Sequence, residues 1–346
     1  MEKIIDPVDV NLLKAELTED RLLCKTNKAG NLIYVVDCHN APNVLREVGR
    51  LREISFREAG GSSGLSMDID EFDTMEKPYS QIVVWDPDAE RIIGGYRYIL
   101  GTDVVLEENG QPHLATAHMF RFSEKFMQKY LAHTIELGRS FVTPDYQSSK
   151  MGAKSIFSLD NLWDGIIAIV LKHPDIHYIF GKFTMYPSYS PAAKDLILRF
   201  YWKHFEDKEK LVEPYVPMMP VSRPEILDLI LHSDEFKEDY RLLKEAVRKL
   251  GTNIPPLVNS YMNISLGVKM FGTAINDEFS NVDETGILVD FSDINVDKID
   301  RHVNALLNTT IEKAKRRFPG LKPEFGEKLR LRWFERKNKR HKILEK

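Results

Sequence analysis

The sequence predicts a mixed α/β fold with both antiparallel and crossover connections between its strands. Three observations support this class. Short apolar runs alternate with longer segments of helical periodicity, two β-rich runs are joined by a tight turn, and the order reads strand, helix, hairpin, strand, helix, strand, helix. A chain of 346 residues with 43% hydrophobic side chains can also bury a substantial core.

The first half of the chain supplies the expected hairpin and the helix that precedes it. Residues 31–38 (NLIYVVDC) form a short apolar run typical of a strand, and apolar residues recur at helical spacing over 42–58. The glycine-rich segment 60–64 then ends this helix. Residues 81–86 (QIVVWD) and 91–100 (RIIGGYRYIL) are rich in β-branched and aromatic residues and are joined by the turn PDAE. They predict an antiparallel hairpin.

The middle of the chain continues the alternation of strands and helices. A strand is expected near 133–142 (HTIELGRSFV), followed by a helix from about 153–172. A second strand at 177–181 (HYIFG) leads to a helix at 189–205. Residues 206–254 are charged and mostly of helical pattern, which indicates an insertion and not a second core.

The C-terminal part completes the expected domain. Residues 255–271 are interpreted as a helix, 286–292 (GILVDFS) as the last strand, and 295–312 as a further helix with one apolar face. We therefore expect one main domain over 1–295, with the insertion at about 206–254. A C-terminal helix and a basic tail would follow over 296–346.

Composition excludes several classes of function. The net charge of -4 is small against 29% charged residues, so no overall field points to nucleic acid as a partner. Cys24 and Cys38 are too few for a disulfide framework and lack zinc-ligand spacing, which favours a reducing cytoplasm. The acidic N-terminus does not resemble a signal peptide, and no stretch is apolar for long enough to span a bilayer. We expect any contact with lipid to be peripheral.

Several familiar sites lack the residues that they need. The segment GGSSG at 60–64 has no Gly-Lys-Ser/Thr and so predicts a flexible loop and not a phosphate-binding P-loop. His173 and His177 have the spacing of a metal pair, but Pro174 breaks the helix that would align them, and no metal site is expected. Ser140 is not in a G-x-S-x-G context. No covalent nucleophile is therefore expected.

Charged residues placed inside or beside apolar elements are the main signal of a site. They are Asp68, Asp70, Asp73, Arg97, Glu136 and Arg139. Burying such groups is costly unless they are paired, so the pattern predicts an internal network of carboxylates and guanidinium groups. Two interpretations are open: a structural ion-pair network, or a network that faces a substrate. Glu136 and Arg139 would face opposite sides of an ideal strand, unless a bulge lies between them.

These residues resemble a known family in order and spacing. The pattern begins at Arg52 and Phe56, passes through the three aspartates and Arg97 in GGYRY, and reaches ELGRSFVTPDY. It is similar to the GNAT-related acyltransferases, which include acyl-homoserine-lactone synthases and the ornithine-lipid and glycine-lipid N-acyltransferases often called hemolysin-like. Segment 253–291 is similar to the closing segment of the lipid-type group. The lactone synthases favour a tryptophan soon after the Phe56 position and a glutamate in place of Asp68, which disfavours lactone synthesis.

The resemblance implies a GNAT-like, mostly antiparallel central sheet flanked by helices. In that fold two neighbouring strands splay apart and the acyl thioester enters between them. Here these would be the strands at 133–142 and 177–181. The loop at 143–154 would take the place of the pyrophosphate loop, with Lys150 and Lys154 available for one phosphate. One phosphate fits the phosphopantetheine of an acyl carrier protein better than coenzyme A, although either thioester can serve as co-substrate, and no bound cofactor is expected.

The resemblance also implies roles for the charged residues. Glu136, the only carboxylate in the expected central strand, would accept the proton of the attacking amine. Arg97 and Arg139 would bind an acceptor carboxylate through paired hydrogen bonds, with Arg52 and Phe56 beside them. The aspartates would hold these arginines in place.

We therefore expect an N-acyltransferase that moves a long fatty acyl group from acyl carrier protein to an amino acid such as ornithine or glycine, the first step of aminolipid synthesis. Two alternatives are an acyl-homoserine-lactone synthase and a non-catalytic module that binds acyl carrier protein or membrane. From Lys313 onward the chain is strongly basic, with Trp333 and Phe334 among its lysines and arginines. This tail is suited to an acidic carrier protein or to the inner membrane face, or it is simply solvated.

Overall fold

A computed structural model describes residues 1–147, 153–265, 267–294 and 296–317. Its centre is an eight-stranded sheet in the order β1-β2-β3-β4-β6-β7-β10-β9. The strands are β1 (Leu22–Lys25), β2 (Leu32–Val36), β3 (Ser80–Asp86), β4 (Arg91–Leu100), β6 (Thr134–Val142), β7 (Tyr178–Met185), β9 (Lys269–Asn276) and β10 (Val282–Asp290). Every neighbouring pair is antiparallel except β6 and β7. The predicted mixed and mostly antiparallel fold is thus confirmed.

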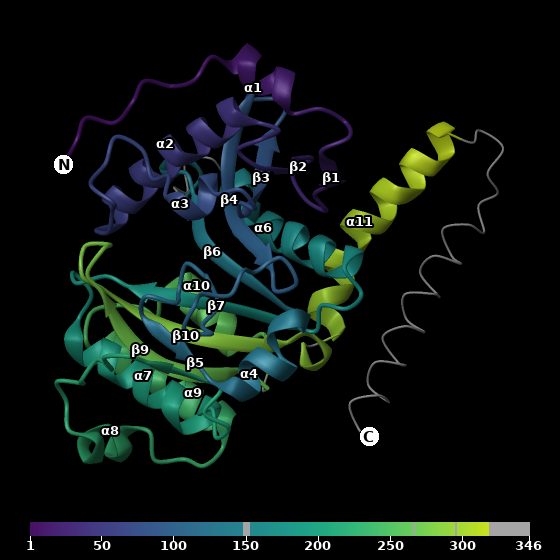
Figure 1. The fold of residues 1–346 in the computed structure, drawn as a ribbon. Helices are drawn as coiled ribbons and strands as arrows, with labels where there is room; N and C mark the ends of the chain where they lie inside the picture. Colours follow the sequence, from purple (N-terminus) through teal and green to yellow (C-terminus); the bar gives the residue numbers. More distant parts are fainter. Residues whose placement is uncertain (148–152, 266, 295, 318–346) are drawn as a thin grey trace.

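Helices cover both faces of this sheet. They are α1 (Val10–Glu16), α2 (Pro42–Ala59), α3 (Glu71–Thr74), α4 (Glu124–Lys129), α5 (Pro144–Gln147), α6 (Ala153–Lys172), α7 (Pro191–Phe205), α8 (Pro224–Ile230), α9 (Phe236–Lys249), α10 (Pro256–Met262) and α11 (Val296–Arg317). Two short strands, β5 (Phe120–Phe122) and β8 (Val212–Pro214), form a separate antiparallel pair. Figure 1 shows the N-terminal strands with α2 in the upper half of the molecule, and β7, β9 and β10 with α7 to α9 in the lower half.

The two faces of β3 show why its sequence is apolar throughout. Ile82 and Val84 join the core cluster that contains α6, whereas Val83 and Trp85 join the cluster that contains α2. Because successive side chains of a strand point to opposite faces, a strand covered on both sides is buried along nearly its whole length. This arrangement fixes which face of the neighbouring strand carries Arg97.

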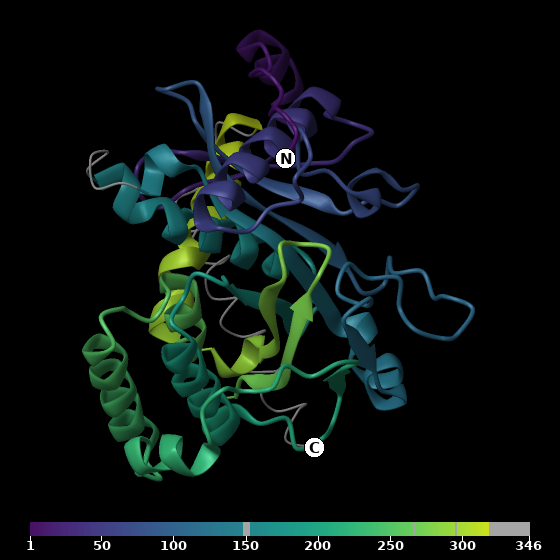
Figure 2. The ribbon, with the colours of Figure 1, turned by 90° about the vertical axis from the view of Figure 1, so that its left-hand side faces the viewer.

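The halves of the sheet separate at the junction of β6 and β7. These strands pair in parallel only from Thr134 and Tyr178 to Leu137 and Gly181. Beyond that point β6 continues beside β4, and β7 continues beside β10. The two strands that the sequence resemblance singled out therefore splay apart, as expected, and Figure 2 shows the two halves from the side.

A β-bulge interrupts β6 immediately after the splay. Between the pairs Arg97–Gly138 and Gly95–Phe141, β4 advances two residues while β6 advances three. Arg139 lies in the extra stretch and has a φ of 48°, in the left-handed region that a residue with a side chain rarely adopts. The bulge turns Arg139 toward the face that carries the glutamate three residues before it. With this bulge between them, Glu136 and Arg139 can share one face of the sheet, which an ideal strand would not allow.

The interpretation of 255–271 as one helix was wrong. Helix α10 ends at Met262, and β9 starts at Lys269 as an edge strand beside β10. A continuous apolar run does not distinguish a buried helix from a buried strand, and here both elements have buried side chains. The strand β1 was also not expected. It is only four residues long, too short for a periodic signal.

The charged segment 206–254 contains β8, α8 and α9. Helix α9 packs against α7, and its Leu243 and Val247 are fully buried in the same core cluster as the central sheet. The segment therefore extends the existing core. The division into a domain over 1–295 and a tail stays a prediction. Within the described ranges, no helix combines the length and apolar character needed to cross a membrane.

Candidate active site

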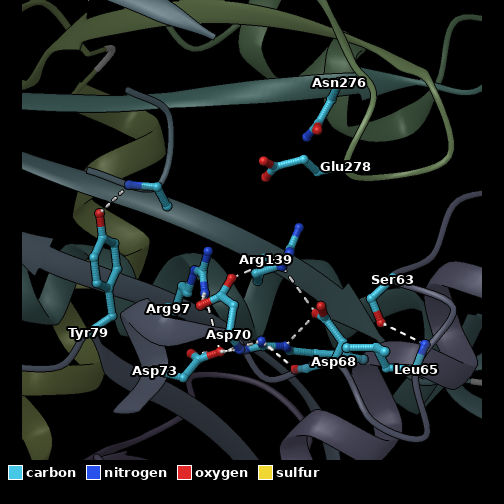
Figure 3. A network of polar contacts seen from close by, with 12 residues as sticks. Ser63, Leu65, Asp68, Asp70, Asp73, Tyr79, Arg97, Arg139, Asn276 and Glu278 are labelled. Carbon is cyan, nitrogen blue, oxygen red and sulfur yellow. Dashed lines mark hydrogen bonds and ion pairs between the residues drawn. The ribbon is translucent and has the colours of Figure 1, made fainter. Parts of the chain in front are cut away.

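A cavity of about 290 Å³ lies on the face of the sheet where β6 and β7 diverge. The segment after α2, the strands β4, β6 and β7, and the turn between β9 and β10 surround it. Figure 3 shows polar side chains converging from the segment after α2, from β4 and β6, and from the end of β9 and the turn that follows it. The predicted residues that line it are Asp68, Asp70, Arg97, Glu136 and Arg139. The structure therefore brings together the charged residues that the sequence pattern singled out, although they are spread over about seventy positions.

Glu136 lies in β6 and its side chain is buried. The hydroxyl of Tyr79 donates to Oε2, and Thr116 Oγ1 donates to Oε1 over 2.7 Å. Tyr79 in turn accepts the backbone N–H of Ala115 at 3.0 Å. Burial raises the pKa of Glu136, while both hydroxyl donors and the charges of Arg97 and Lys182 oppose that rise. A carboxylate with a raised pKa and no ion-pair partner among the described residues is suited to accept a proton.

Arg52 anchors helix α2 to the polar network. Its side chain is completely buried, and its Nε donates to Asp68 Oδ2 at 2.9 Å. Its Nη2 donates to Asp73 Oδ2 at 2.7 Å and to the backbone oxygen of Asp68 at 2.5 Å. Burial opposes the charge of Arg52, but Asp73 and Asp68 outweigh it and raise the pKa of the guanidinium. Arg52 does not line the cavity, so its geometry is that of a positioning residue.

Arg97 reaches the cavity from β4, and one edge of its guanidinium is occupied. Nη1 donates to Asp70 Oδ1 at 2.6 Å and to Asp73 Oδ2 at 3.2 Å. The group also lies over the ring of Tyr79, 5.2 Å from its centroid. Its buried Nε has no hydrogen-bond partner within the described part of the chain. Since a buried N–H without a partner is costly, this atom indicates a place for a ligand oxygen.

Arg139 approaches the same cavity from the bulge of β6. Its Nη2 donates to Asp70 Oδ2 at 3.4 Å, and its guanidinium lies 4.7 Å from the ring centroid of Phe279. Nε is 3.1 Å from Asp68 Oδ2, close enough for an ion pair. However, the N–H direction does not form a hydrogen bond there, and Nε has no such partner among the residues described. Arg139 therefore also presents an unused donor.

The three aspartates neutralise the three arginines. Burial opposes ionisation of Asp68, but Arg139, Arg52 and Arg97 outweigh it and lower its pKa. Asp73 behaves in the same way, with Arg52 and Arg97 lowering its pKa. Asp68 and Asp73 are thus held ionised, and the backbone N–H of Asp70 also donates to Asp73 Oδ2 at 3.2 Å. The network fixes the segment after α2 against the sheet.

The remaining predicted residues either do not line the cavity or lie outside the part of the chain that the structure describes. Phe56 packs edge-to-face on Phe279, 5.3 Å between ring centroids, and does not itself line the cavity. Lys150 lies outside the described residues. Lys154 falls in α6, but its side chain is likewise outside the description. The acyl-donor loop is therefore still a prediction.

Several lining residues were missed by the sequence reasoning. Lys182 of β7 lines the cavity and is partly buried, and it forms an ion pair with the buried Glu284 of β10. Lys182 directly follows the expected strand 177–181, so extending that strand by one residue would have shown a lysine inside an apolar run, the signal that revealed Arg97. Tyr79 and Thr116 carry no comparable signal, because each reaches Glu136 from a segment outside the regular strands.

The turn between β9 and β10 forms the far wall of the cavity. Figure 3 shows Asn276 and Glu278 opposite Arg139. Ser280 in this turn accepts the backbone N–H of Ser62 at 3.0 Å and donates to the Ser62 oxygen at 3.1 Å. The glycine-rich loop at 60–64 is therefore held across the cavity by a reciprocal pair of hydrogen bonds. In the described ranges, no three His, Cys, Asp or Glu side chains are grouped to hold a metal ion.

Comparison with known proteins agrees with this geometry. Residues 51–155, which include the second half of α2, the aspartates and all of β6, match the Acetyltransferase (GNAT) domain. Solved structures of a CoA-dependent acyl-homoserine lactone synthase, BjaI, cover 80% of this chain and 90% of their own, at 13% identity and a TM-score of 0.36. That likeness is too distant to bear on function.

Two curated proteins are far more similar over nearly their whole length. A glycine N(alpha)-acyltransferase of Bacteroides thetaiotaomicron is 57% identical over 309 residues, which is 89% of this chain and 92% of that protein. A glycine N(alpha)-acyltransferase of Phocaeicola vulgatus is 54% identical over 315 residues, 91% of this chain and 97% of that protein. These relatives confirm the prediction that the chain is an acyltransferase. The chain belongs to the GNAT family of N-acyltransferases.

Proposed function

We propose that this enzyme transfers a long-chain acyl group from an acyl carrier protein thioester to the amino group of glycine. The name shared by the two curated relatives supports glycine as acceptor. The observation in the site that carries the proposal is the pair of unused, buried Nε–H donors on Arg97 and Arg139. Two directed donors match the two oxygens of an amino acid carboxylate.

The cavity also offers a proton acceptor for the amine of the same molecule. Glu136 lies in the same cavity as the two arginines, and its carboxylate is held by hydroxyl donors and not by a cation. With the glycine carboxylate bound to the arginines, the amine would lie near Glu136. The amine must lose its proton before it can attack a thioester carbonyl, and a buried carboxylate can take that proton directly or through water.

The acyl donor would enter where β6 and β7 diverge. Past Leu137 and Gly181 the two strands no longer pair with each other, so backbone groups on their facing edges are available to an extended pantetheine arm. The amine nitrogen forms a bond to the carbonyl carbon, the carbon–sulfur bond breaks, and the products are an N-acylglycine and a free thiol. An acyl carrier protein or coenzyme A can each deliver this thioester.

The proposal extends to the cellular role. An N-acylglycine with a long chain is an amphiphile, and we propose that it is the first intermediate of an aminolipid. The basic tail beyond residue 317 would bring the enzyme to acidic carrier protein or to the cytoplasmic membrane face. Mass spectrometry of lipid extracts from cells that overproduce the enzyme tests this extension, and a lack of N-acylglycine and of its further acylated products would contradict it.

The direct test is a competition between glycine and methylamine, its decarboxylated analogue. Purified enzyme would receive a long-chain acyl thioester on carrier protein or on coenzyme A in separate arms. We expect glycine to be preferred by about 2 to 3 kcal/mol, the scale of a lost charged hydrogen bond. Arg139→Lys should remove most of this preference, because a lysine has no Nε–H donor directed at the carboxylate. Arg121→Lys, at an exposed surface ion pair, is the matched control.

Each arm has an outcome that counts against the proposal. Equal use of glycine and methylamine by the wild-type enzyme would rule out the arginine clamp. A higher kcat/KM with acyl-CoA than with acyl carrier protein would refute the assignment of the donor while leaving the acceptor intact. Loss of activity in the Arg121 variant would show that charge-conserving changes disturb the fold in general.

A further inference from the structure

Lys182 occupies the point on β7 where the sheet opens. It is the first residue of β7 after Gly181, the last position that pairs with β6. Glu136 pairs with Phe180, so their side chains point to the same face of the sheet, and Lys182, two residues further, shares that face. Its side chain lines the same cavity. Glu136 and Lys182 therefore approach the cavity from the two strands that diverge.

Glycines stand beside Lys182 on both sides. Gly286 of β10 is its direct partner, and Gly138 of β6 follows the last pair between β6 and β7. Neither position has a side chain that would cover the lysine from its neighbouring strand. A Cβ added at Gly138 would be in ordinary contact with Arg97 Nε at 3.6 Å, so the unused donor of Arg97 lies directly beside this glycine. A reacting group can thus lie between Lys182 and the arginines.

The ammonium group of Lys182 is held between opposing charges. Its side chain is 14% exposed, and it pairs with Glu284 Oε1, whose other oxygen accepts Thr184 Oγ1 at 2.9 Å. Burial lowers the pKa of Lys182, Glu284 opposes this, and the positive charges of Arg139 and Arg97 lower it further. Glu136 adds a carboxylate on the opposite strand. A buried ammonium with a lowered pKa gives up its proton more readily than a solvated one.

We propose that Lys182 is the acid that protonates the thiolate sulfur as it leaves the acyl group. This proposal rests on the proposed thioester aminolysis. Glu136 first takes one proton from the glycine ammonium and releases it to water. The neutral amine nitrogen then bonds to the carbonyl carbon and gives its second proton to Glu136, which again passes it to water. The carbon–sulfur bond breaks, its electron pair goes to sulfur, and sulfur takes a proton from Lys182 Nζ. Water returns a proton to Lys182 after the thiol departs, and Glu284 stabilises the restored ammonium.

The competing explanation is that Lys182 and Glu284 only tie β7 to β10. Two variants separate these roles. Lys182→Arg keeps a positive charge for Glu284, but a guanidinium does not deprotonate in proteins and cannot act as the acid. Lys182→Met keeps an unbranched side chain without charge. A structural role predicts that arginine restores activity, whereas the acid role predicts that both variants are impaired.

The decisive experiment varies the leaving group. Acyl thioesters of N-acetylcysteamine and of thiophenol would be compared as donors to glycine, because an aryl thiolate leaves without needing a proton. With the alkyl thioester we expect both variants to lose on the order of a hundredfold in kcat relative to wild type. With the aryl thioester the loss should shrink to a few-fold. If Lys182→Met does not fold, the same comparison with Lys182→Arg decides.

Two results would overturn the assignment. An equal loss with both donors would show that Lys182 supports the structure of the site and does not act on the sulfur. Wild-type rates for Lys182→Arg with the alkyl thioester would show that positive charge alone suffices. By contrast, if the wild-type enzyme forms no N-acylglycine from either donor or from acyl carrier protein, the proposed function itself fails, and the result is distinct from both.

Discussion

Replacing Glu136 with glutamine tests the proposed proton acceptor and changes the shape of the side chain very little. Both Tyr79 and Thr116 donate to the carboxylate, but an amide has only one oxygen to accept with. One hydroxyl therefore loses its acceptor, at a cost of about 1 to 3 kcal/mol. A neutral amide is also less costly to bury than a carboxylate, which offsets part of that loss. We expect the free energy of unfolding to change by less than about 2 kcal/mol.

The effect on turnover should be much larger than the effect on stability. Positioned general bases contribute about 10²- to 10⁴-fold, and glutamine cannot accept the amine proton. We expect kcat for glycine to fall on the order of a hundredfold in Glu136→Gln, which corresponds to about 2.7 kcal/mol of lost transition-state stabilisation. Glu124→Gln, at an exposed position in α4, is the matched control and should keep wild-type turnover.

The pH dependence of kcat provides an independent readout. Burial raises the pKa of Glu136, so the wild-type rate should fall with decreasing pH at a higher pH than for an ordinary carboxyl group. This acid limb should be absent in Glu136→Gln. Near-normal turnover by a folded Glu136→Gln enzyme, with the acid limb unchanged, would show that another group is the base.

Three further predictions address the network, the pKa of Glu136 and the tail. Arg52→Met removes the guanidinium that Asp68 and Asp73 share inside the protein, and should lower the free energy of unfolding by about 3 to 5 kcal/mol in urea titrations. A change below about 1 kcal/mol would contradict the anchoring role. Thr116→Val removes a hydrogen bond that lowers the pKa of Glu136, so the acid limb of the kcat profile should move to higher pH, and a shift to lower pH would refute this assignment. Deletion of 318–346 should weaken binding to acidic carrier protein or anionic vesicles, most strongly at low salt, and equal affinity at every salt concentration would leave the tail without this role.

The hairpin of β3 and β4 could be predicted because its signals are local. Apolar and β-branched residues fill both strands, and the turn between them is short, so pairing needs no information from distant parts of the chain. Arg97 was evident for a related reason, since a charge inside such a run must find a partner. Its partners Asp70 and Asp73, and Asp68 beside them, were identifiable from their crowding in one short segment.

The other features depend on contacts that periodicity does not encode. Strand β9 is set by its pairing with β10, and its first residues, 269–271, fell within the helix that was expected. The bulge that brings Arg139 to the cavity is visible only in the register between β4 and β6. Tyr79 and Thr116 meet Glu136 across 57 and 20 positions of the chain, from segments whose local sequence gives no reason to place them there.

The balance of charge in the site has a consequence for how an acceptor is recognised. Asp68, Asp70 and Asp73 already neutralise Arg52, Arg97 and Arg139, and Lys182 is paired with Glu284. A carboxylate that enters the cavity therefore meets no excess of positive charge, and its binding must come from directed N–H donors at short range. Short-range contacts in a buried cavity are little affected by salt, whereas exposed charges are screened over about 10 Å at 0.1 M ionic strength. The KM for glycine should accordingly stay nearly constant between low and moderate salt, while the KM for acyl carrier protein rises. A parallel rise of both would mean that glycine is drawn in by net charge, and that the arginines are not as fully neutralised as their contacts indicate.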